Sequence, residues 1–300
     1  MDYLSSHINN HGCALCVEKG LQLEIPARAQ VIRVLMDELT RLASHQLWWG
    51  AMAMDLGAIT PFFHAFRERE EINDIMEETC GARLTMNYMV PGGVMYDLHP
   101  DFQRRVKDFI KLFKLKIDEY DELVTGNVIF QNRMMGVGYL SREDAISYGC
   151  TGPTARGSGV KCDIRKLYPY EVYSKLQFDE VIEEKGECFS RYLVRLHELK
   201  QSLSIVEQLI DNIPEGDFQA KTKAVLKLPK GEFFSRVETA RGEFGVYIVS
   251  EGGTTPYRIK FRSPGFSNLS ALDHMVRGEK IGDLVAAMGT LDLVIPDIDR

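Results

Sequence analysis

The segment HGCALC, residues 11–16, carries residue types that bind metals or exchange electrons. Cys13 and Cys16 are three positions apart, His11 stands just ahead of them, and His7 is four residues before His11. A structural zinc ion needs four ligands, usually with a second pair from elsewhere, and the sequence has no second CxxC. A thioredoxin-type redox site would need the motif to follow a strand of a βαβ unit. We therefore expect the two cysteines to be small buried residues on a core helix, with no metal bound.

A glycine-rich segment, GCTGPTARGSG, could cradle an anion. It fits neither GxxxxGK[ST] nor a GxGxxG that follows a strand, so phosphate binding is not indicated. Its backbone amides and Arg156 could still contact an anion or a partner. We favour a structural loop whose glycines let its backbone pack closely against another segment. Such a loop could also lie at a subunit interface.

Asp55 stands in WWGAMAMDLGAIT, among apolar residues and near a predicted helix end. A carboxylate is costly to bury unless it has a partner. Two interpretations stay open: a structural salt bridge, or a buried carboxylate that tunes a proton donor.

Composition limits the classes of protein. The chain has 300 residues, of which 45% are hydrophobic and 26% charged, as in ordinary globular proteins. A net charge of −7 argues against nucleic acid as the main partner. No apolar stretch reaches the roughly 18 residues of a membrane span. Six scattered cysteines favour a reducing compartment over a disulfide framework.

Hydrophobic periodicity predicts a helical bundle followed by a small β-containing region. The expected helices cover residues 3–19, 26–56, 61–89, 101–124, 127–133 and 189–213, with two short ones near 268–276 and 279–289. In the long helix 189–213, one buried seam is formed by Tyr192, Leu196, Leu199, Leu203, Val206 and Ile210. EFGVYIVSEGGTTPYRIKF alternates and turns at Gly252 and Gly253, which predicts a β-hairpin. We expect a mainly α (α+β) fold with a bundle core at 1–213 and a C-terminal region at 214–300 packed on it.

Many segments in order resemble one family. They include DYLSSHINNHG, PARAQVIRVLMDELTRL, MDLGAITPFF, YGCTGPTARGSGVKCDIRK, RGEFGVYIVSEGG and GTLDLVIPDIDR. Together they resemble the hydrogenase-related quinone-site subunit (49-kDa or D type) of NADH:quinone oxidoreductase, respiratory complex I, over essentially the whole chain. The resemblance implies the fold of the nickel–iron hydrogenase large subunit without its metal.

The resemblance also implies partners and substrate. It implies that no cofactor is bound by this chain and that quinone is the substrate. The terminal iron–sulfur cluster would lie in an adjacent small subunit, and NAD would bind elsewhere in the complex. Other peripheral-arm subunits and a membrane subunit with the quinone channel would be partners, with no nucleic acid. The chain would be peripheral, on the cytoplasmic side of the cell membrane, in a complex that couples quinone reduction to proton translocation.

Five residues match functional positions of the family. By resemblance, Tyr3 hydrogen-bonds the quinone head group and donates a proton. Asp55 matches a carboxylate that pairs, in relatives, with a histidine on an upstream β-hairpin, and we expect that N-terminal region to be missing here. Phe66 matches an apolar wall residue, and Asp292 and Val294 match residues beside the quinone channel.

Two positions depart from the family pattern. Thr85 stands where many relatives have a histidine near the cluster, and Val90 where many have an arginine. We therefore expect an altered cluster potential or pH dependence, and a low-potential quinone such as menaquinone is one hypothesis.

Two alternatives remain. The large subunit of a membrane-bound nickel–iron hydrogenase shares the fold, but it needs four thiolates and no cysteine follows Cys188. The other alternative is a non-catalytic scaffold, and we expect the isolated chain to be inactive.

Overall fold

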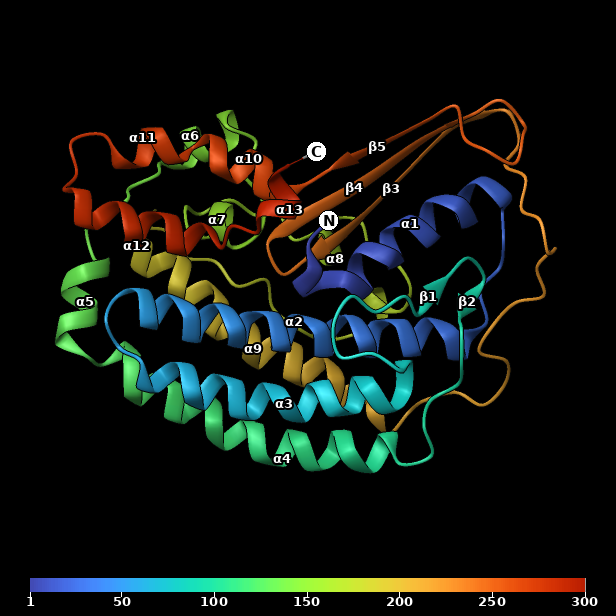
Figure 1. The fold of residues 1–300 in the computed structure, drawn as a ribbon, viewed down its shortest axis with the longest axis horizontal. Coiled ribbons are helices and arrows are strands. Elements are labelled where there is room, and N and C mark those ends of the chain that lie inside the picture. Colours follow the sequence, from blue (N-terminus) through green and yellow to red (C-terminus); the bar gives the residue numbers. More distant parts are fainter. Residues whose placement is uncertain (300) are drawn as a thin grey trace.

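The computed structural model describes residues 1–299 and shows a bundle of long helices beside a small sheet (Figure 1). The long helices are α1 (Ser6–Leu21), α2 (Ala27–Asp55), α3 (Thr60–Cys80), α4 (Phe102–Tyr120) and α9 (Cys188–Ile210). The short ones are α5 (Val128–Met134), α6 (Arg142–Ser147), α7 (Gly152–Arg156), α8 (Ile164–Leu167), α10 (Pro264–Ser270), α11 (Leu272–Val276), α12 (Ile281–Leu291) and α13 (Ile295–Ile298). A π-helical turn, Asp121–Thr125, extends α4. The mainly α fold is thereby confirmed.

Helix α2 runs through the centre of the bundle and is buried along most of its length. The ring of Trp49 stacks on that of Tyr120 from α4, with centroids 4.1 Å apart. All six seam residues predicted for α9 are buried, which confirms that seam. These helices form because their apolar residues recur with the helical period and bury one continuous core.

Helix α3 is shorter than predicted, so the expected helix over 61–89 is wrong beyond Cys80. Gly81 ends it in the left-handed conformation, with a φ of 77°. The chain then turns back, and Arg83 binds Asp74 at 2.6 Å and Glu77 at 2.7 Å on the last turns of α3. The VPGGV segment forms a tight hairpin of two short strands, β1 (Met89–Val90) and β2 (Gly93–Val94).

The C-terminal region contains an antiparallel sheet in the order β3-β4-β5. Its strands are β3 (Gly231–Thr239), β4 (Gly242–Ser250) and β5 (Arg258–Arg262). The hairpin between β4 and β5 confirms the prediction, whereas β3 was not predicted. Helix α1 packs against β3 and β4, so the start of the chain covers the sheet (Figure 1). The division of the chain at 213/214 stays a prediction.

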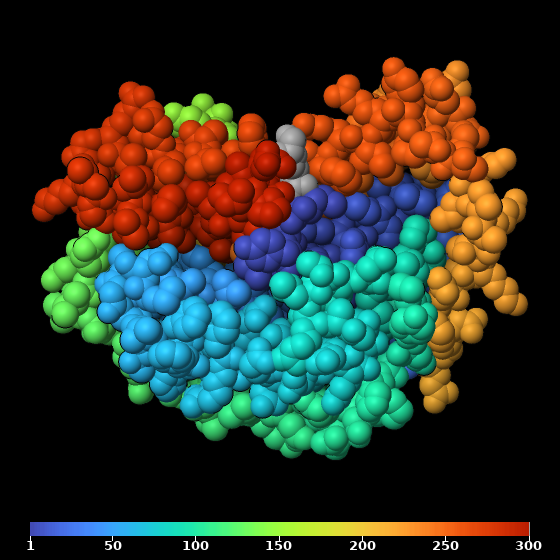
Figure 2. Space-filling view, in the orientation of Figure 1, coloured from blue at the N-terminus to red at the C-terminus, as the bar shows by residue number. Residues whose placement is uncertain are grey.

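The first and last described elements lie close together. The first residues of the chain and α13 are neighbours in Figure 1. In Figure 2 the N-terminal residues, in deep blue, lie in a seam between the red C-terminal helices and the segment around residues 50–90. Among residues 1–299, no helix is long and apolar enough to cross a membrane.

Candidate functional site

A surface hollow of about 220 Å³ brings Tyr3 beside the segment that carries Thr85. It is lined by Met1, Asp2, Tyr3, Ser6, Asn9, Asn10, Thr85, Met86 and Asn87. Tyr3 is 42% exposed, so its phenol is available to a ligand. The hollow is rich in hydroxyl and amide groups, and its one carboxylate, that of Asp2, is already bound. It therefore suits a neutral ligand with hydrogen-bonding groups.

The turn that carries Tyr3 is built by Asp2. Its Oδ1 accepts a hydrogen bond of 2.9 Å from the backbone N–H of Leu4, which starts the 3-10 turn Tyr3–Ser5. The backbone carbonyl of Asp2 accepts from Nδ2 of Asn9 at 2.9 Å. The predicted helix 3–19 is thus a 3-10 turn followed by α1, which ends at Leu21 rather than near Gly20.

The opposite wall of the hollow is held by α1 and α2. Nδ2 of Asn10 donates to the backbone carbonyl of Met86 at 2.6 Å. Arg33 of α2 donates to the carbonyls of Val90 at 2.8 Å and Gly93 at 3.0 Å, which fixes the β1–β2 hairpin. Thr85 has a φ of 53°, a left-handed backbone that is unusual for a β-branched residue. This strained backbone is next to the hollow that Tyr3 lines.

The guanidinium of Arg241 joins Asp2 to Asp292. Its Nη1 lies 2.7 Å from Oδ2 of Asp2, and its Nη2 lies 2.9 Å from Oδ1 of Asp292. All three side chains are buried, with exposures of 0% for Arg241, 2% for Asp2 and 7% for Asp292. Val294, two residues beyond Asp292, is also buried. The structure therefore brings the segments of Tyr3 and of Asp292 and Val294 into one neighbourhood.

The structure places Asp55 and Phe66 elsewhere. Asp55 is the last residue of α2, exposed and with no hydrogen-bond or ion-pair partner among residues 1–299. Both open interpretations, a structural salt bridge and a buried carboxylate, are therefore wrong for this chain by itself, because the Asp55 side chain lies exposed at the end of α2. Eleven residues of helix separate Asp55 from Ser44, which contacts Arg241, a rise of about 16 Å. Phe66 is half-buried on α3 and stacks on Phe62, with ring centroids 4.2 Å apart.

The cysteines of HGCALC pack under the sheet. Cys16 is fully buried, with its Sγ 3.5 Å from the carbonyl oxygens of Phe233 and Val246. Cys13 is partly buried against the same cluster, and burial raises the pKa of its thiol to about 11. Such groups stay protonated, unlike metal-ligating thiolates. The expected packing of Cys16 is confirmed. Among the described residues, no group of three or more His, Cys, Asp or Glu is placed to hold a metal ion.

The two histidines of this segment have different surroundings. Nδ1 of His11 lies 2.6 Å from Oδ2 of Asp37, and its Nε2 lies 3.0 Å from Oε1 of Glu171. Burial lowers the pKa of His11, but the charge of Asp37 and the hydrogen bonds to both carboxylates outweigh it and raise this pKa to about 9. Burial lowers the pKa of His7 to about 3, and its Nε2 lies 3.7 Å from Sγ of Cys80. His11 is thus a cationic link between helices, and His7 is neutral.

The glycine-rich loop is structural, as favoured. A Cβ at Gly152, which has a φ of 65°, would lie 2.4 Å from the carbonyl oxygen of Arg241. Arg156 is fully buried and binds Glu238 at 2.7 Å as well as Glu198. An anion or partner cannot reach Arg156, so that possibility is excluded by its burial.

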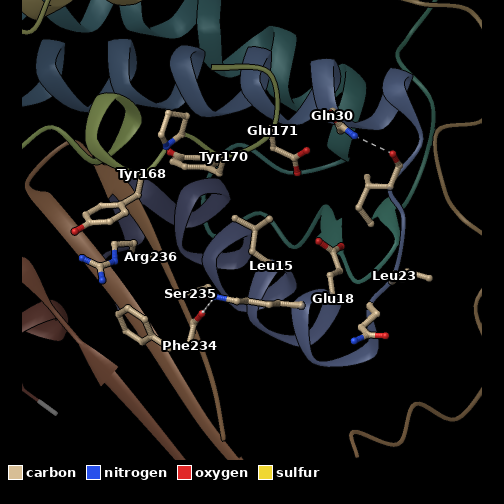
Figure 3. Close-up of a pocket in the computed structure, with 14 residues that line it drawn as sticks. Leu15, Glu18, Leu23, Gln30, Tyr168, Tyr170, Glu171, Phe234, Ser235 and Arg236 are labelled. Atoms are coloured by element: carbon tan, nitrogen blue, oxygen red, sulfur yellow. Dashed lines mark hydrogen bonds between the residues drawn. The ribbon is translucent and has the colours of Figure 1, made fainter. Parts of the chain in front are cut away.

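A larger cleft of about 770 Å³ lies on another face and contains none of the five predicted site residues (Figure 3). It is bounded by the end of α1, residues 168–171 and β3. Its two carboxylates, Glu18 and Glu171, both bind Arg33, at 2.5 Å and 2.8 Å. On the opposite wall, the guanidinium of Arg236 lies over the rings of Tyr168 at 4.2 Å and Phe234 at 5.0 Å. The ionised groups of this cleft thus already have partners within the chain.

Sequence reasoning missed Arg241 and Asp2. Arg241 stands in the RGE of a segment quoted for the family resemblance, directly before the predicted hairpin. The structure places Arg241 at the turn Thr239–Gly242, between β4 and the strand β3 that was not predicted. Asp2 stands directly before Tyr3 at a helix start, where aspartate is a preferred cap.

Comparisons with known proteins give a consistent result. Residues 55–300 match the family model described as "Respiratory-chain NADH dehydrogenase, 49 Kd subunit". The C/D subunit of the NADH-quinone oxidoreductase of Bacteroides thetaiotaomicron is 54% identical over 300 residues, which are 100% of this chain and 57% of that protein. The second D subunit of Solibacter usitatus is 47% identical and the D subunit of Bacillus cytotoxicus 46%, each over 100% of this chain and over 81% and 82% of the relative. The chain thus spans little more than half the length of the C/D relative.

Proposed function

Because the chain belongs to the 49 kDa subunit family of the respiratory-chain NADH dehydrogenases, we propose that it forms the quinone head-group site of an NADH:quinone oxidoreductase. The site would be shared with an adjacent subunit that holds the terminal iron–sulfur cluster. In the proposed reaction, one quinone takes up two electrons and two protons and becomes one quinol. NADH, oxidised elsewhere in the complex, supplies the electrons.

The hollow beside Tyr3 is the observation that supports this proposal most directly. A quinone head group is neutral and carries two carbonyl oxygens that accept hydrogen bonds. The exposed phenol of Tyr3 can donate one such bond, and hydroxyl and amide groups of Thr85 and Asn87 line the same hollow. The carboxylate of Asp2 is already bound by Leu4 and Arg241, so it does not oppose electron density on the ring.

Tyr3 is the proposed proton donor. As the quinone gains electrons, negative charge develops on its carbonyl oxygen, and the phenol O–H can transfer its proton there. The phenolate left on Tyr3 then needs a proton from another group. We assign that supply to Asp55 together with the histidine that relatives carry upstream, brought to the site by the assembled complex, because Asp55 is exposed and unpaired in this chain. Phe66 and Val294 would form apolar wall, and Asp292 would border the quinone path.

Partner subunits must complete the site. The hollow, at about 220 Å³, is smaller and more open than the pockets of roughly 300–1,000 Å³ that enclose small ligands. We therefore propose that the small iron–sulfur subunit and a membrane subunit with the quinone channel cover it. Other peripheral-arm subunits hold the chain in a peripheral position on the cytoplasmic side of the membrane. The isolated chain is expected to be inactive, and proton translocation would belong to the whole complex.

A photoreactive quinone tests this placement. The complex that contains this chain is irradiated with an azido-quinone, and labelled peptides are identified by mass spectrometry. We expect labels within residues 1–10 or 85–87, suppressed by excess unmodified quinone. Labelling of this chain only in the larger cleft of Figure 3, or labelling that excess quinone does not suppress, would contradict the proposal.

A further inference from the structure

The side chain of Arg241 binds three separate segments of the chain. Its Nη1 donates to Oδ2 of Asp2 at 2.7 Å and to Oγ of Ser44 on α2 at 3.2 Å. Its Nε and Nη2 donate to the backbone carbonyl and to Oδ1 of Asp292, both at 2.9 Å. The guanidinium is planar and presents its donors in a fixed fork, so these bonds set relative positions as well as charge balance.

The bond to Asp2 acts directly on the turn that carries Tyr3. Each carboxylate oxygen of Asp2 has one partner, Leu4 N–H on one side and Arg241 on the other. A movement of the Arg241 side chain would therefore pull the cap of the 3-10 turn Tyr3–Ser5. Tyr3 itself is 42% exposed and is not held in place by burial.

The bond to Asp292 acts on the other end of the chain. Asp292 follows α12 in the left-handed conformation, with a φ of 56°. Arg241 binds its carbonyl and its side chain, which supports this strained backbone where the chain turns from α12 to α13. The backbone of Arg241 is itself fixed, because the Gly152 backbone packs against its carbonyl and Nδ2 of Asn268 donates to that carbonyl at 3.3 Å.

Buried ion pairs of this kind contribute little net stability, because the desolvation of the charges offsets their attraction. Stability alone therefore does not single out Arg241 among the buried arginines; its partners do, because they belong to the turn of Tyr3 and to the Asp292 segment. We propose that Arg241 is a positioning residue for quinone reduction, which holds the phenol of Tyr3 in place relative to α2 and to the Asp292 segment. This inference rests on the proposed function and adds a residue to it.

The test uses the assembled complex and combines two substitutions. Arg241→Lys keeps the charge but loses the fork, so one of the two carboxylates loses its bond. We expect turnover (kcat) with quinone to fall about tenfold in the presence of Tyr3, as for one lost charge-assisted hydrogen bond. In the Tyr3→Phe background the same Arg241→Lys change should alter kcat less than about twofold, because the phenol that it positions is already gone. Such non-additivity identifies residues that act through one another.

Two further variants separate positioning from a merely structural role. Asp2→Asn keeps a cap for Leu4 but weakens the bond to Arg241, and it serves as the second variant if Arg241→Lys does not assemble. Arg156→Lys is the matched control, because Arg156 is equally buried between two carboxylates, Glu198 and Glu238. It should leave kcat per assembled complex unchanged.

The outcomes are distinguishable. An equal loss of kcat from Arg241→Lys, or from Asp2→Asn, with and without the Tyr3 phenol would overturn the inference. If the wild-type complex reduces no quinone at all, the proposed function is itself wrong. A complex that is active, and in which Arg241→Lys matters only when Tyr3 is present, supports both.

Discussion

Asp2 and Asp292, near the two ends of the chain, bind one and the same guanidinium, that of Arg241. The bond unites the turn of Tyr3 with the segment that leads to Val294, although the whole bundle lies between them in sequence. The turn of Tyr3 is therefore linked, through Asp2 and Arg241, to Asp292 at the end of α12. Substitutions at this site, and in the elements that support it, should change quinone turnover, stability or the cluster potential.

Tyr3→Phe removes the proposed proton donor. Because general acid catalysis contributes about 10²–10⁴-fold, we expect kcat of the complex with quinone to fall by at least about a hundredfold. Assembly should be unchanged, since Tyr3 is exposed and its phenol has no hydrogen-bond partner among residues 1–299. Tyr257→Phe, at a tyrosine that is 72% exposed outside the hollow, is the control. Near-normal turnover of a fully assembled Tyr3→Phe complex would exclude the proposed role.

Asp55→Asn should separate stability from activity. The Asp55 carboxylate is exposed at the C-terminal end of α2, where the helix dipole disfavours negative charge. Its removal should raise the free energy of unfolding by about 0.3–1 kcal/mol or leave it unchanged, while quinone turnover in the complex falls. Thermal unfolding and a quinone reductase assay check the two parts, with the exposed Asp179→Asn as control. A destabilised chain would reveal a partner of Asp55, and undiminished turnover would exclude its proton role.

His11→Asn should change how stability depends on pH. The pKa of His11 is raised from 6.5 to about 9, so the charged form is stabilised in the folded chain. Its contribution, roughly 3 kcal/mol, is complete below pH 6.5 and is lost as the pH rises from about 6.5 to 9. The difference in unfolding free energy between wild type and His11→Asn should shrink over that range. His197→Asn, at a histidine whose side chain is 44% exposed, is the control. A difference that stays constant from pH 6.5 to 9 would mean that the folded chain does not raise the pKa of His11.

Two glycines of the glycine-rich loop form a matched pair. Gly149 and Gly152 have φ values of 66° and 65°, but a Cβ at Gly149 meets nothing within 4 Å, whereas one at Gly152 meets the backbone of Arg241 at 2.4 Å. Gly149→Ala should destabilise the chain by about 1–2 kcal/mol, the strain of the left-handed backbone alone. Gly152→Ala should cost about 1–3 kcal/mol more, because the two backbones must separate. Equal losses in chemical denaturation would show that the close approach does not matter.

Thr85→His should restore a titrating group beside Tyr3. Under the proposed function, the potential of the neighbouring terminal iron–sulfur cluster depends little on pH in the wild type. With Thr85→His it should fall by up to about 59 mV per pH unit, as for one proton taken up with one electron. Histidine tolerates the positive φ of this position better than threonine, so the loop should persist. Redox titrations at several pH values measure the effect, with Asn87→His in the same hollow as control. A cluster potential that depends strongly on pH in the wild type would contradict the role assigned to Thr85.

Much of the fold could be predicted from local pattern. The helical period of the α9 seam and the alternation of β4 and β5 reflect which side of each element is buried. The prediction failed where the pattern is weak. A helix was predicted to continue after Gly81, but Met86 and Tyr88 belong to a loop and are buried where that loop packs against α1. Strand β3 was missed because its first half is only partly buried and shows little alternation.

Some features of the candidate site could likewise be predicted from the sequence, and others could not. Tyr3, Phe66, Asp292 and Val294 were assigned through the family resemblance alone, whereas Asp55 was also singled out by its apolar neighbours in sequence. The burial of Asp292 and the exposure of Asp55 could not be read from neighbouring residues, because both stand at helix ends with apolar surroundings in sequence. The helix end at Asp292 is covered because Arg241, 51 residues away in sequence, binds Asp292. The helix end at Asp55 has no such partner among residues 1–299.

Composition, local spacing and ordered motifs were thus enough to predict the family, the long helices and the residue types available for chemistry. The folded chain was needed to learn that Tyr3 and Thr85 line one hollow, that Asp2 and Asp292 bind Arg241, and that Asp55 has no partner within residues 1–299. The physical reason is that contacts between remote segments have no period along the chain. They arise when α1, α2 and the sheet bury their apolar faces together and thereby fix which polar groups meet.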